Sequence, residues 1–219
     1  MQAQTQSPSG DFSRVNVVFL PGEELLQTQL RLAAEIAAGK DVRFYIDNER
    51  YFAHLSVYPL SFPTGNWESV LREVEKVARR FSPLTLRFKE FYFGERWNDV
   101  GVGFRRTPEL SSAQDRIVKS LDYLREGYYP EWYDTEIAAG RLDGVRYEFV
   151  KRWGTPNIFR FWEPHLTLAL FAEVHDAQKA CQWLKSQRMP ATHITKLAVV
   201  ETDQYGTCTG IIKIFSIGK

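Results

Sequence analysis

The residues that offer chemistry stand in two short stretches with the same order of residue types. Residues 54–57 read HLSV and residues 165–168 read HLTL. Alternate side chains of a β-strand point to opposite faces, so each stretch is predicted to place an imidazole beside a hydroxyl. An imidazole exchanges protons near neutral pH, and a hydroxyl can donate a hydrogen bond to an anion. Two such pairs are suited to acid–base chemistry at a phosphate.

The two stretches lie 111 residues apart, and the same offset aligns the segments that follow them. The aligned pairs are 67–80 with 176–187, which have helical spacing, and 84–93 with 195–204 and 98–104 with 209–215, which are strand-like. Repetition of a whole supersecondary unit indicates an architecture. Each unit is predicted to contain a motif strand, a helix and two further strands.

Two motifs of this form in a duplicated chain resemble the 2H phosphoesterase superfamily, which includes 2′-5′ RNA ligase-like proteins and cyclic nucleotide phosphodiesterases. The resemblance covers most of residues 15–216. It implies an α+β, duplicated, two-lobed fold, with antiparallel sheets and outer helices around a central cleft and with pseudo-twofold symmetry. We expect a disordered N-terminal tail at 1–13 and a single domain at 14–219. Its motif lobes are expected at about 50–104 and 160–216.

Other elements must position the motifs. A buried strand is expected at 15–20, a helix at 21–39, and strands at 42–46 and 50–58 around a turn at 47–48. A second long helix, at 109–126, holds the corresponding place before the second motif. Because the connection from that helix to His165 is longer, we expect an insertion within 127–156.

The motif residues give a catalytic hypothesis. His54 and His165 are expected to act as general acid and base, and Ser56 and Thr167 to donate hydrogen bonds to the non-bridging phosphate oxygens. By resemblance, His165 activates water and His54 protonates the leaving oxygen. The scheme requires no metal and no other cofactor.

Three further residues are candidate substrate contacts. Members of the superfamily often carry an arginine shortly after a motif, whereas this chain has Tyr58 after the first motif. Arg160, which precedes the second motif, substitutes for that arginine only if it faces the cleft. Trp153 belongs to the aromatic-rich insertion, where a ring can stack on a nucleobase or can simply anchor the connection.

The remaining histidines lack this support. His193 also has a hydroxyl residue two positions later, but the offset pairs it with Ser82, and His175 has no counterpart. Both are interpreted as structural or surface residues. A metallohydrolase using the four histidines is disfavoured, because the chain has no HExxH or HxH pattern.

The hypothesis favoured is a metal-independent phosphodiesterase that hydrolyses a 2′,3′-cyclic or 2′,5′-linked ribonucleotide. The alternative is a catalytically weak nucleotide- or RNA-end-binding module that retains the cleft. The presence of both motif histidines favours the enzyme, and the absence of an arginine shortly after either motif favours the binding module.

Composition limits the partners. A formal net charge of +1 gives no broad basic field, so duplex DNA is not expected, and a small nucleotide or an RNA end is. No stretch has the length of a membrane span or the order of a signal peptide. Cys181 and Cys208 have no ligand-like spacing and are expected to be reduced thiols. We therefore expect a cytoplasmic monomer.

We predict that turnover persists in excess EDTA, because activation of water is assigned to an imidazole. The measurement is the hydrolysis rate before and after chelation. Loss of activity that zinc or manganese restores would favour the metallohydrolase.

Overall fold

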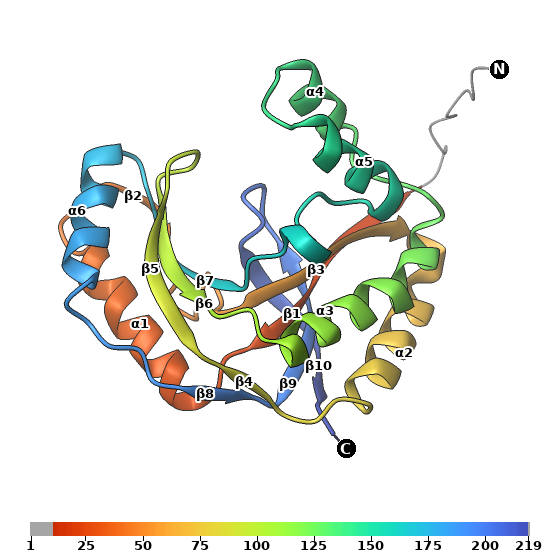
Figure 1. The fold of residues 1–219 in the computed structure, drawn as a ribbon, viewed down its shortest axis with the longest axis horizontal. Coiled ribbons are helices and arrows are strands. Elements are labelled where there is room, and N and C mark those ends of the chain that lie inside the picture. The colour runs from red at the N-terminus through yellow and green to blue at the C-terminus, as the bar shows by residue number, and fades with distance from the viewer. Residues whose placement is uncertain (1–10, 219) are drawn as a thin grey trace.

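The computed structural model describes residues 11–218, which form an α+β fold (Figure 1), as predicted. The α-helices are α1 (Glu23–Ala37), α2 (Trp67–Ala78), α3 (Pro108–Leu121), α4 (Trp132–Ala138), α5 (Gly144–Trp153) and α6 (Val174–Leu184). The strands are β1 (Phe12–Leu20), β2 (Val42–Tyr45), β3 (Leu55–Pro63), β4 (Leu84–Leu86), β5 (Phe88–Gly94), β6 (Asp99–Phe104), β7 (His165–Phe171), β8 (Thr192–Ile194), β9 (Lys196–Thr202) and β10 (Cys208–Ser216). Short 3₁₀ turns lie at η1 (Thr64–Asn66), η2 (Asp122–Arg125) and η3 (Phe159–Phe161).

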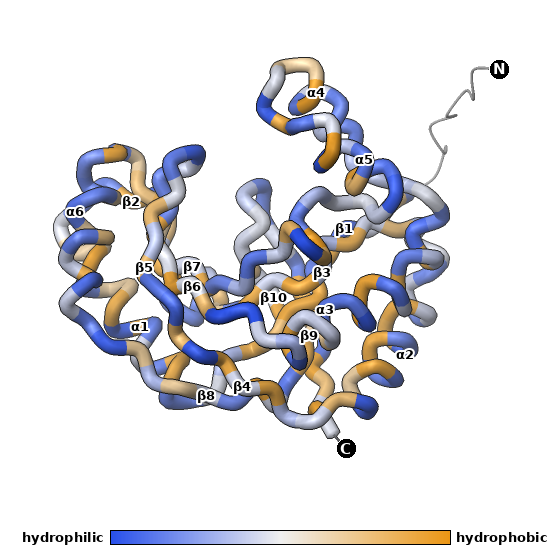
Figure 2. Tube along the Cα trace, viewed as in Figure 1, coloured by the Kyte–Doolittle hydropathy of each residue, from blue (hydrophilic) through white to orange (hydrophobic). Residues whose placement is uncertain are grey.

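Two four-stranded antiparallel sheets make the two lobes. One has the strand order β10-β9-β1-β3 and the other the order β2-β7-β6-β5. Helices α2 and α3 pack on the first sheet, and α1 and α6 pack on the second (Figure 1). Hydrophobic residues gather on the central strands and on the inner sides of these helices (Figure 2), where one large core joins both lobes. Among residues 11–218, none of the helices combines the length and apolar character needed to cross a bilayer.

The two repeats exchange their hairpins. Strand β3 opens the first repeat, but the hairpin β5-β6 of that repeat joins β7 in the other sheet, and β9-β10 joins β1 beside β3. The lobes are therefore not the contiguous segments 50–104 and 160–216 that the repeat suggested. The two crossing connections pair with each other through β4 and β8, at the lower edge of the view in Figure 1.

The segment before the first motif also differs from the expected hairpin. Strand β2 pairs with β7, whereas β3 pairs with β1, so the residues between them pass from one sheet to the other. The Ile46 amide donates to the Leu168 carbonyl on one side, and the Phe52 amide donates to the Cys208 carbonyl on the other, both at 2.9 Å. As a result β3 begins at Leu55, directly after the first motif histidine.

The N-terminal segment is only partly described. Strand β1 begins at Phe12, so residues 12 and 13 belong to a strand and not to the tail that was expected at 1–13. Residues 1–10, on which most of that prediction falls, lie outside the described residues. The strand gains its pairing from both neighbours, β3 and β9, and is a central strand of its sheet.

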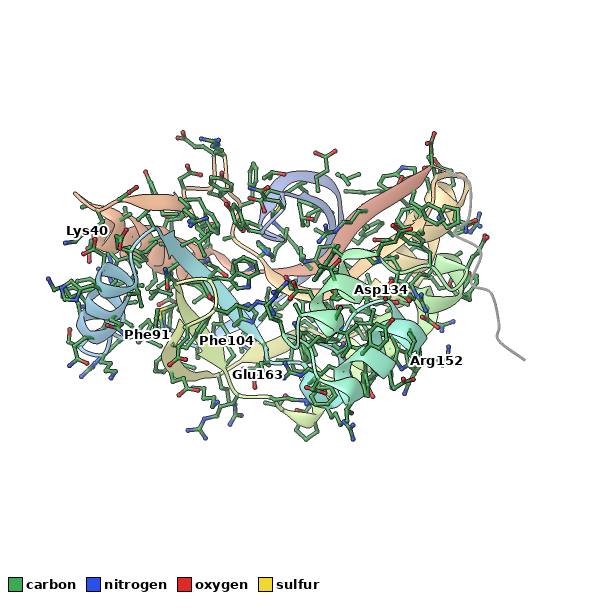
Figure 3. All side chains as sticks on the ribbon, turned by 90° about the horizontal axis from the view of Figure 1, so that it is seen from above. Lys40, Phe91, Phe104, Asp134, Arg152 and Glu163 are labelled. Atoms are coloured by element: carbon green, nitrogen blue, oxygen red, sulfur yellow. The ribbon has the colours of Figure 1, made fainter. Side chains whose placement is uncertain are left out.

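The stretch expected as an insertion contains α4 and α5, which project from the body of the protein (Figure 1). Asp134 and Arg152 both lie over it, on the side of the molecule away from Lys40 and Phe91 (Figure 3). The buried guanidinium of Arg125 fastens it to the body, because its Nη2 donates to the Arg152 carbonyl at 2.8 Å. This part of the chain has a small core of its own, formed by Tyr133, Leu142 and Val150.

Close packing around Gly101 on β6 gives a stability prediction. A Cβ there would lie 2.5 Å from the Leu166 carbonyl oxygen and 2.6 Å from the Tyr92 ring and hydroxyl. We expect Gly101→Ala to lower the free energy of unfolding by about 1–3 kcal/mol, because these atoms must move.

Gly103→Ala, on the same strand, is the matched control, since a Cβ there would have its nearest neighbours at 3.6 Å, an ordinary van der Waals distance. Urea unfolding of both variants measures the difference. Equal destabilisation of the two would contradict the packing argument.

Candidate active site

Each motif histidine is held by the same backbone contact. Nδ1 of His54 lies 2.9 Å from the Phe52 carbonyl oxygen, and Nδ1 of His165 lies 2.8 Å from the Glu163 carbonyl oxygen. A carbonyl only accepts hydrogen bonds, so Nδ1 carries the hydrogen in both rings. Nε2 is then the atom available for proton transfer. The contact spans two residues in both repeats, as expected for equivalent positions.

A β-bulge at Val57 turns Tyr58 away from Ser56. Ser56 lies opposite Val18, and Tyr58 lies opposite the adjacent Val17, so Val57 is the extra residue. Tyr58 is fully buried and its hydroxyl donates at 2.9 Å to a backbone carbonyl at the end of α5. Burial raises its pKa. This placement argues against Tyr58 as a substrate contact, the role expected from its position after the first motif.

The second motif strand has the same bulge, at Leu168, which the offset of 111 aligns with Val57. A buried glutamine amide donates to each of the two bulged segments. Nε2 of Gln29 on α1 donates to the Thr167 carbonyl at 2.9 Å, and Nε2 of Gln114 on α3 donates to the Val57 carbonyl at 3.4 Å. The helices that precede the motifs therefore hold the strands that carry them.

The Ser56 hydroxyl is oriented by Asn16 on β1. Asn16 Nδ2 donates to Ser56 Oγ at 2.8 Å, which leaves the Ser56 hydrogen for an acceptor in the site. Asn16 is buried, and its Oδ1 has no hydrogen-bond partner in the described part of the chain. The sequence analysis missed Asn16, although a lone amide inside the apolar run of β1 was a visible signal.

Two residues of the β5-β6 hairpin surround His165. The Tyr92 ring lies edge-on to the His165 ring with centroids 5.6 Å apart, and its hydroxyl stands beside Thr167 and Asp99 without a hydrogen bond of good geometry. Burial raises the pKa of the Asp99 carboxyl, and its charge interacts with the His165 ring. The hairpin therefore places a buried tyrosine and a carboxyl group beside the second motif histidine.

His54 has a different environment. It is 8% exposed, and burial lowers its pKa to about 4. The His165 ring lowers it further, against the backbone contact and the charge of Asp203, which raise it. The structure therefore brings the two motif histidines close enough to interact electrostatically, with His54 neutral at pH 7.

Two exposed aromatic residues meet where the turns of the hairpins that carry Asp99 and Asp203 come together. Trp97 in the β5-β6 turn and Tyr205 in the β9-β10 turn stand edge to face, with centroids 6.4 Å apart. Trp97 is two residues from Asp99, and Tyr205 is two residues from Asp203. Neither ring stood out in the sequence, because each lies in a turn and their proximity depends on the exchanged hairpins.

The other predicted substrate contacts lie against aromatic rings. The Arg160 guanidinium covers the Phe161 ring at 4.8 Å, and Trp153 packs edge-on against Phe159 at 4.8 Å. Within residues 11–218, no hydrogen bond or ion pair joins either side chain to the four motif side chains. Their role as substrate contacts stays a prediction.

The two remaining histidines lie away from this group. His193 is exposed on β8, with Nδ1 3.3 Å from Thr85 Oγ1, and His175 is exposed at the start of α6. Among the residues that the structure describes, no three His, Cys, Asp or Glu side chains are arranged to hold a metal ion.

A family model described as the 2′-5′ RNA ligase superfamily matches residues 26–206, which include both motifs. The chain belongs to this superfamily. The resemblance to 2H phosphoesterases drawn from the motifs is thereby confirmed. Membership of the superfamily supports a phosphoesterase-type enzyme.

Solved structures of the same fold extend over nearly the whole chain. TT0787 of Thermus thermophilus is 16% identical with a TM-score of 0.56, over 94% of this chain and 98% of that one. LigT of E. coli complexed with 3′-AMP is 13% identical with a TM-score of 0.56, over 95% and 100%. LigT complexed with NADP+ is 12% identical with a TM-score of 0.54, over 95% and 100%. A comparison with curated protein sequences gave no match.

The environment of His54 predicts a pH dependence of stability in this superfamily member. An unfolded imidazole titrates near pH 6.5, whereas folded His54 titrates near 4, so the unfolded chain binds more protons between these values. The free energy of unfolding should fall as pH is lowered through this range, by up to roughly 3 kcal/mol from this group. His54→Asn should remove that part of the pH dependence.

Urea unfolding at several pH values measures the effect, with His193→Asn as the control for an exposed histidine. The prediction fails if the wild-type protein and His54→Asn lose stability in parallel as the pH falls.

Proposed function

We propose that this chain is a metal-independent phosphodiesterase that hydrolyses a 2′,3′-cyclic or 2′,5′-linked ribonucleotide phosphodiester. The observation that carries the proposal is the pair of imidazoles, each with Nδ1 bound to a backbone carbonyl and each accompanied by a hydroxyl. Such hydrolysis needs a base on one side of phosphorus and an acid on the other. Two rings with Nε2 available and unequal surroundings meet that need.

The surroundings suggest how the histidines divide the work. Neutral His54 accepts a proton from water through Nε2, and the water oxygen forms a bond to phosphorus. As the bond from phosphorus to the ribose oxygen breaks, protonated His165 gives its Nε2 proton to that oxygen. Burial favours the neutral form of His54, which suits a base, and the Asp99 carboxyl interacts with the ring of His165, to which we assign the acid. This assignment is the reverse of the one that the resemblance suggested.

The hydroxyls serve the phosphate. Ser56 accepts a hydrogen bond from Asn16 and keeps its hydrogen for a non-bridging oxygen, where negative charge is greatest in the transition state. Thr167 has the corresponding place beside His165. Each supplies one of several contacts, so each contributes less than either histidine.

The ribonucleotide class rests on the relatives. LigT of E. coli has been solved with 3′-AMP, ATP and NADP+, all of which are nucleotides. In this chain the exposed rings of Trp97 and Tyr205, in the turns of the hairpins that carry Asp99 and Asp203, offer stacking faces for a base. We assign the contact with the nucleobase to these two rings in preference to Trp153, whose ring packs against Phe159.

One observation favours the second candidate, a nucleotide- or RNA-end-binding module with weak turnover. The Arg160 guanidinium lies over the Phe149 and Phe161 rings. Among the described residues, no hydrogen bond or ion pair joins this guanidinium to the four motif side chains. Steady-state hydrolysis of a panel of 2′,3′-cyclic nucleotides and 2′,5′-linked oligonucleotides separates the candidates, because the binding module would retain the ligand without turning it over.

Alanine at either motif histidine should lower kcat by about 10²-fold to 10⁴-fold, since each supplies proton transfer. Ser56→Ala and Thr167→Ala should lower it less, and His193→Ala should leave it nearly unchanged. Equal losses for His193→Ala and His54→Ala would exclude the paired site.

The pH profile tests the division of roles. The dependence of kcat/KM on pH should be bell-shaped, because activity needs neutral His54 and protonated His165. With a substrate whose leaving group needs no proton, His165→Ala should recover activity and lose the alkaline limb, whereas His54→Ala should not recover. Recovery of His54→Ala instead would restore the assignment suggested by resemblance.

A further inference from the structure

Five exposed arginines gather where the chain enters α3, outside the site described above. Arg80 follows α2, Arg87 lies between β4 and β5, Arg105 and Arg106 precede α3, and Arg116 lies on α3. We call these residues the arginine surface. Arg80, Arg87 and Arg116 line a cavity of about 450 Å³, whose wall also carries hydroxyls from Ser82, Thr85, Thr107 and Ser112.

None of these arginines is neutralised by an ion pair within residues 11–218. Elsewhere exposed arginines do have carboxylate partners, as Arg79 has Glu75 at 2.5 Å. The cavity wall holds one acid, Glu109, whose carboxylate is hydrogen-bonded at the start of α3 and also interacts electrostatically with Arg87, without forming a salt bridge. With 28 basic and 27 acidic residues in the whole chain, this cluster is a local excess of positive charge.

The arginine surface adjoins the motif of the second repeat. Gly103 lies opposite His165, and the next residue, Phe104, donates its amide to the Pro164 carbonyl at 2.9 Å. Arg105 follows, and its amide donates to the Arg87 carbonyl at 2.8 Å. Arg105 is two residues after Gly103, and two residues of extended chain span roughly 7 Å along the strand. The hydrophilic stretch between β6 and α3 lies on the near side of the molecule in Figure 2. Arg87 and Thr107, at the two sides of this stretch, both line the cavity.

We infer that the arginine surface binds the phosphates of a single-stranded RNA whose terminal phosphodiester lies at His54 and His165. The guanidinium group matches phosphate oxygens with two parallel hydrogen bonds, and arginines without a salt-bridge partner have donors left to make these bonds. Hydroxyls beside them supply further donors. The inference rests on the proposed function and narrows its substrate class, because only a substrate that continues beyond the terminal nucleotide can use these contacts.

The first test compares two substrates with the same reacting end. One is a 2′,3′-cyclic mononucleotide, and the other is a single-stranded oligoribonucleotide that ends in the same cyclic phosphate. The variant carries Arg80→Gln, Arg87→Gln and Arg116→Gln. We expect KM for the oligoribonucleotide to rise about 10-fold or more while kcat/KM for the mononucleotide changes less than about two-fold, since removing phosphate contacts weakens binding at any sequence.

The matched control carries Arg31→Gln, Arg79→Gln and Arg141→Gln, which removes three exposed arginines that have carboxylate partners. It loses the same formal charge and should leave both substrates unaffected. The inference is overturned if control and variant weaken the oligoribonucleotide equally, or if KM for both substrates rises together.

A binding measurement separates this inference from the proposed function. Fluorescence anisotropy of a labelled oligoribonucleotide with a 3′-phosphate, titrated at several salt concentrations, needs no turnover. For single strands the slope of log K against log salt is about −0.7 per phosphate contact, so the triple variant should flatten it by about 2. If the protein hydrolyses neither substrate but shows this change, the proposed function fails and the RNA surface stands. Unchanged slopes, or equal affinity for polyglutamate, would overturn the RNA surface.

Discussion

The hydrogen bond between each motif imidazole and the carbonyl two residues before it is the constraint on which the site depends. It leaves Nε2 of both His54 and His165 available and fixes the plane of each ring. The rest of the architecture holds the backbone that makes this contact. The amides of Gln29 and Gln114, on the covering helices, bind carbonyls of the bulged strands. A site of this kind tolerates little movement, because proton transfer needs hydrogen-bond reach.

The duplication gives His54 and His165 equivalent positions in the two repeats. The residues around the two rings differ, so their environments are unequal. The offset that aligns the histidines places Asp203 at the position of Tyr92 and Gly210 at the position of Asp99. His165 therefore has a tyrosine ring and a carboxylate close to it, whereas His54 is buried beside Asp203. An acid and a base of the same residue type need such a difference, since identical environments would favour the same protonation state in both.

The offset of 111 was enough to predict the order of elements within each repeat, and the resemblance carried by the two motifs implied the α+β class. They could not predict which sheet each hairpin joins, because pairing across such distances leaves no period in the sequence. Nor could alternation show that the bulge at Val57 sends Tyr58 into the core. Asp99 and Tyr92 were missed because they lie beside His165 only when the β5-β6 hairpin pairs with β7, and the sequence did not predict that pairing.

The exchange has a further physical consequence, because each half of the site is built from both repeats. His165 belongs to the second repeat but is flanked by Tyr92 and Asp99 of the first, and His54 belongs to the first but senses Asp203 of the second. Neither repeat alone contains a complete half-site. The connections β4 and β8 pair with each other where the repeats cross, so the chain must bring distant segments together before either sheet is complete. Substrate chemistry and folding therefore depend on the same long-range contacts, and a change that separates the hairpins should affect both.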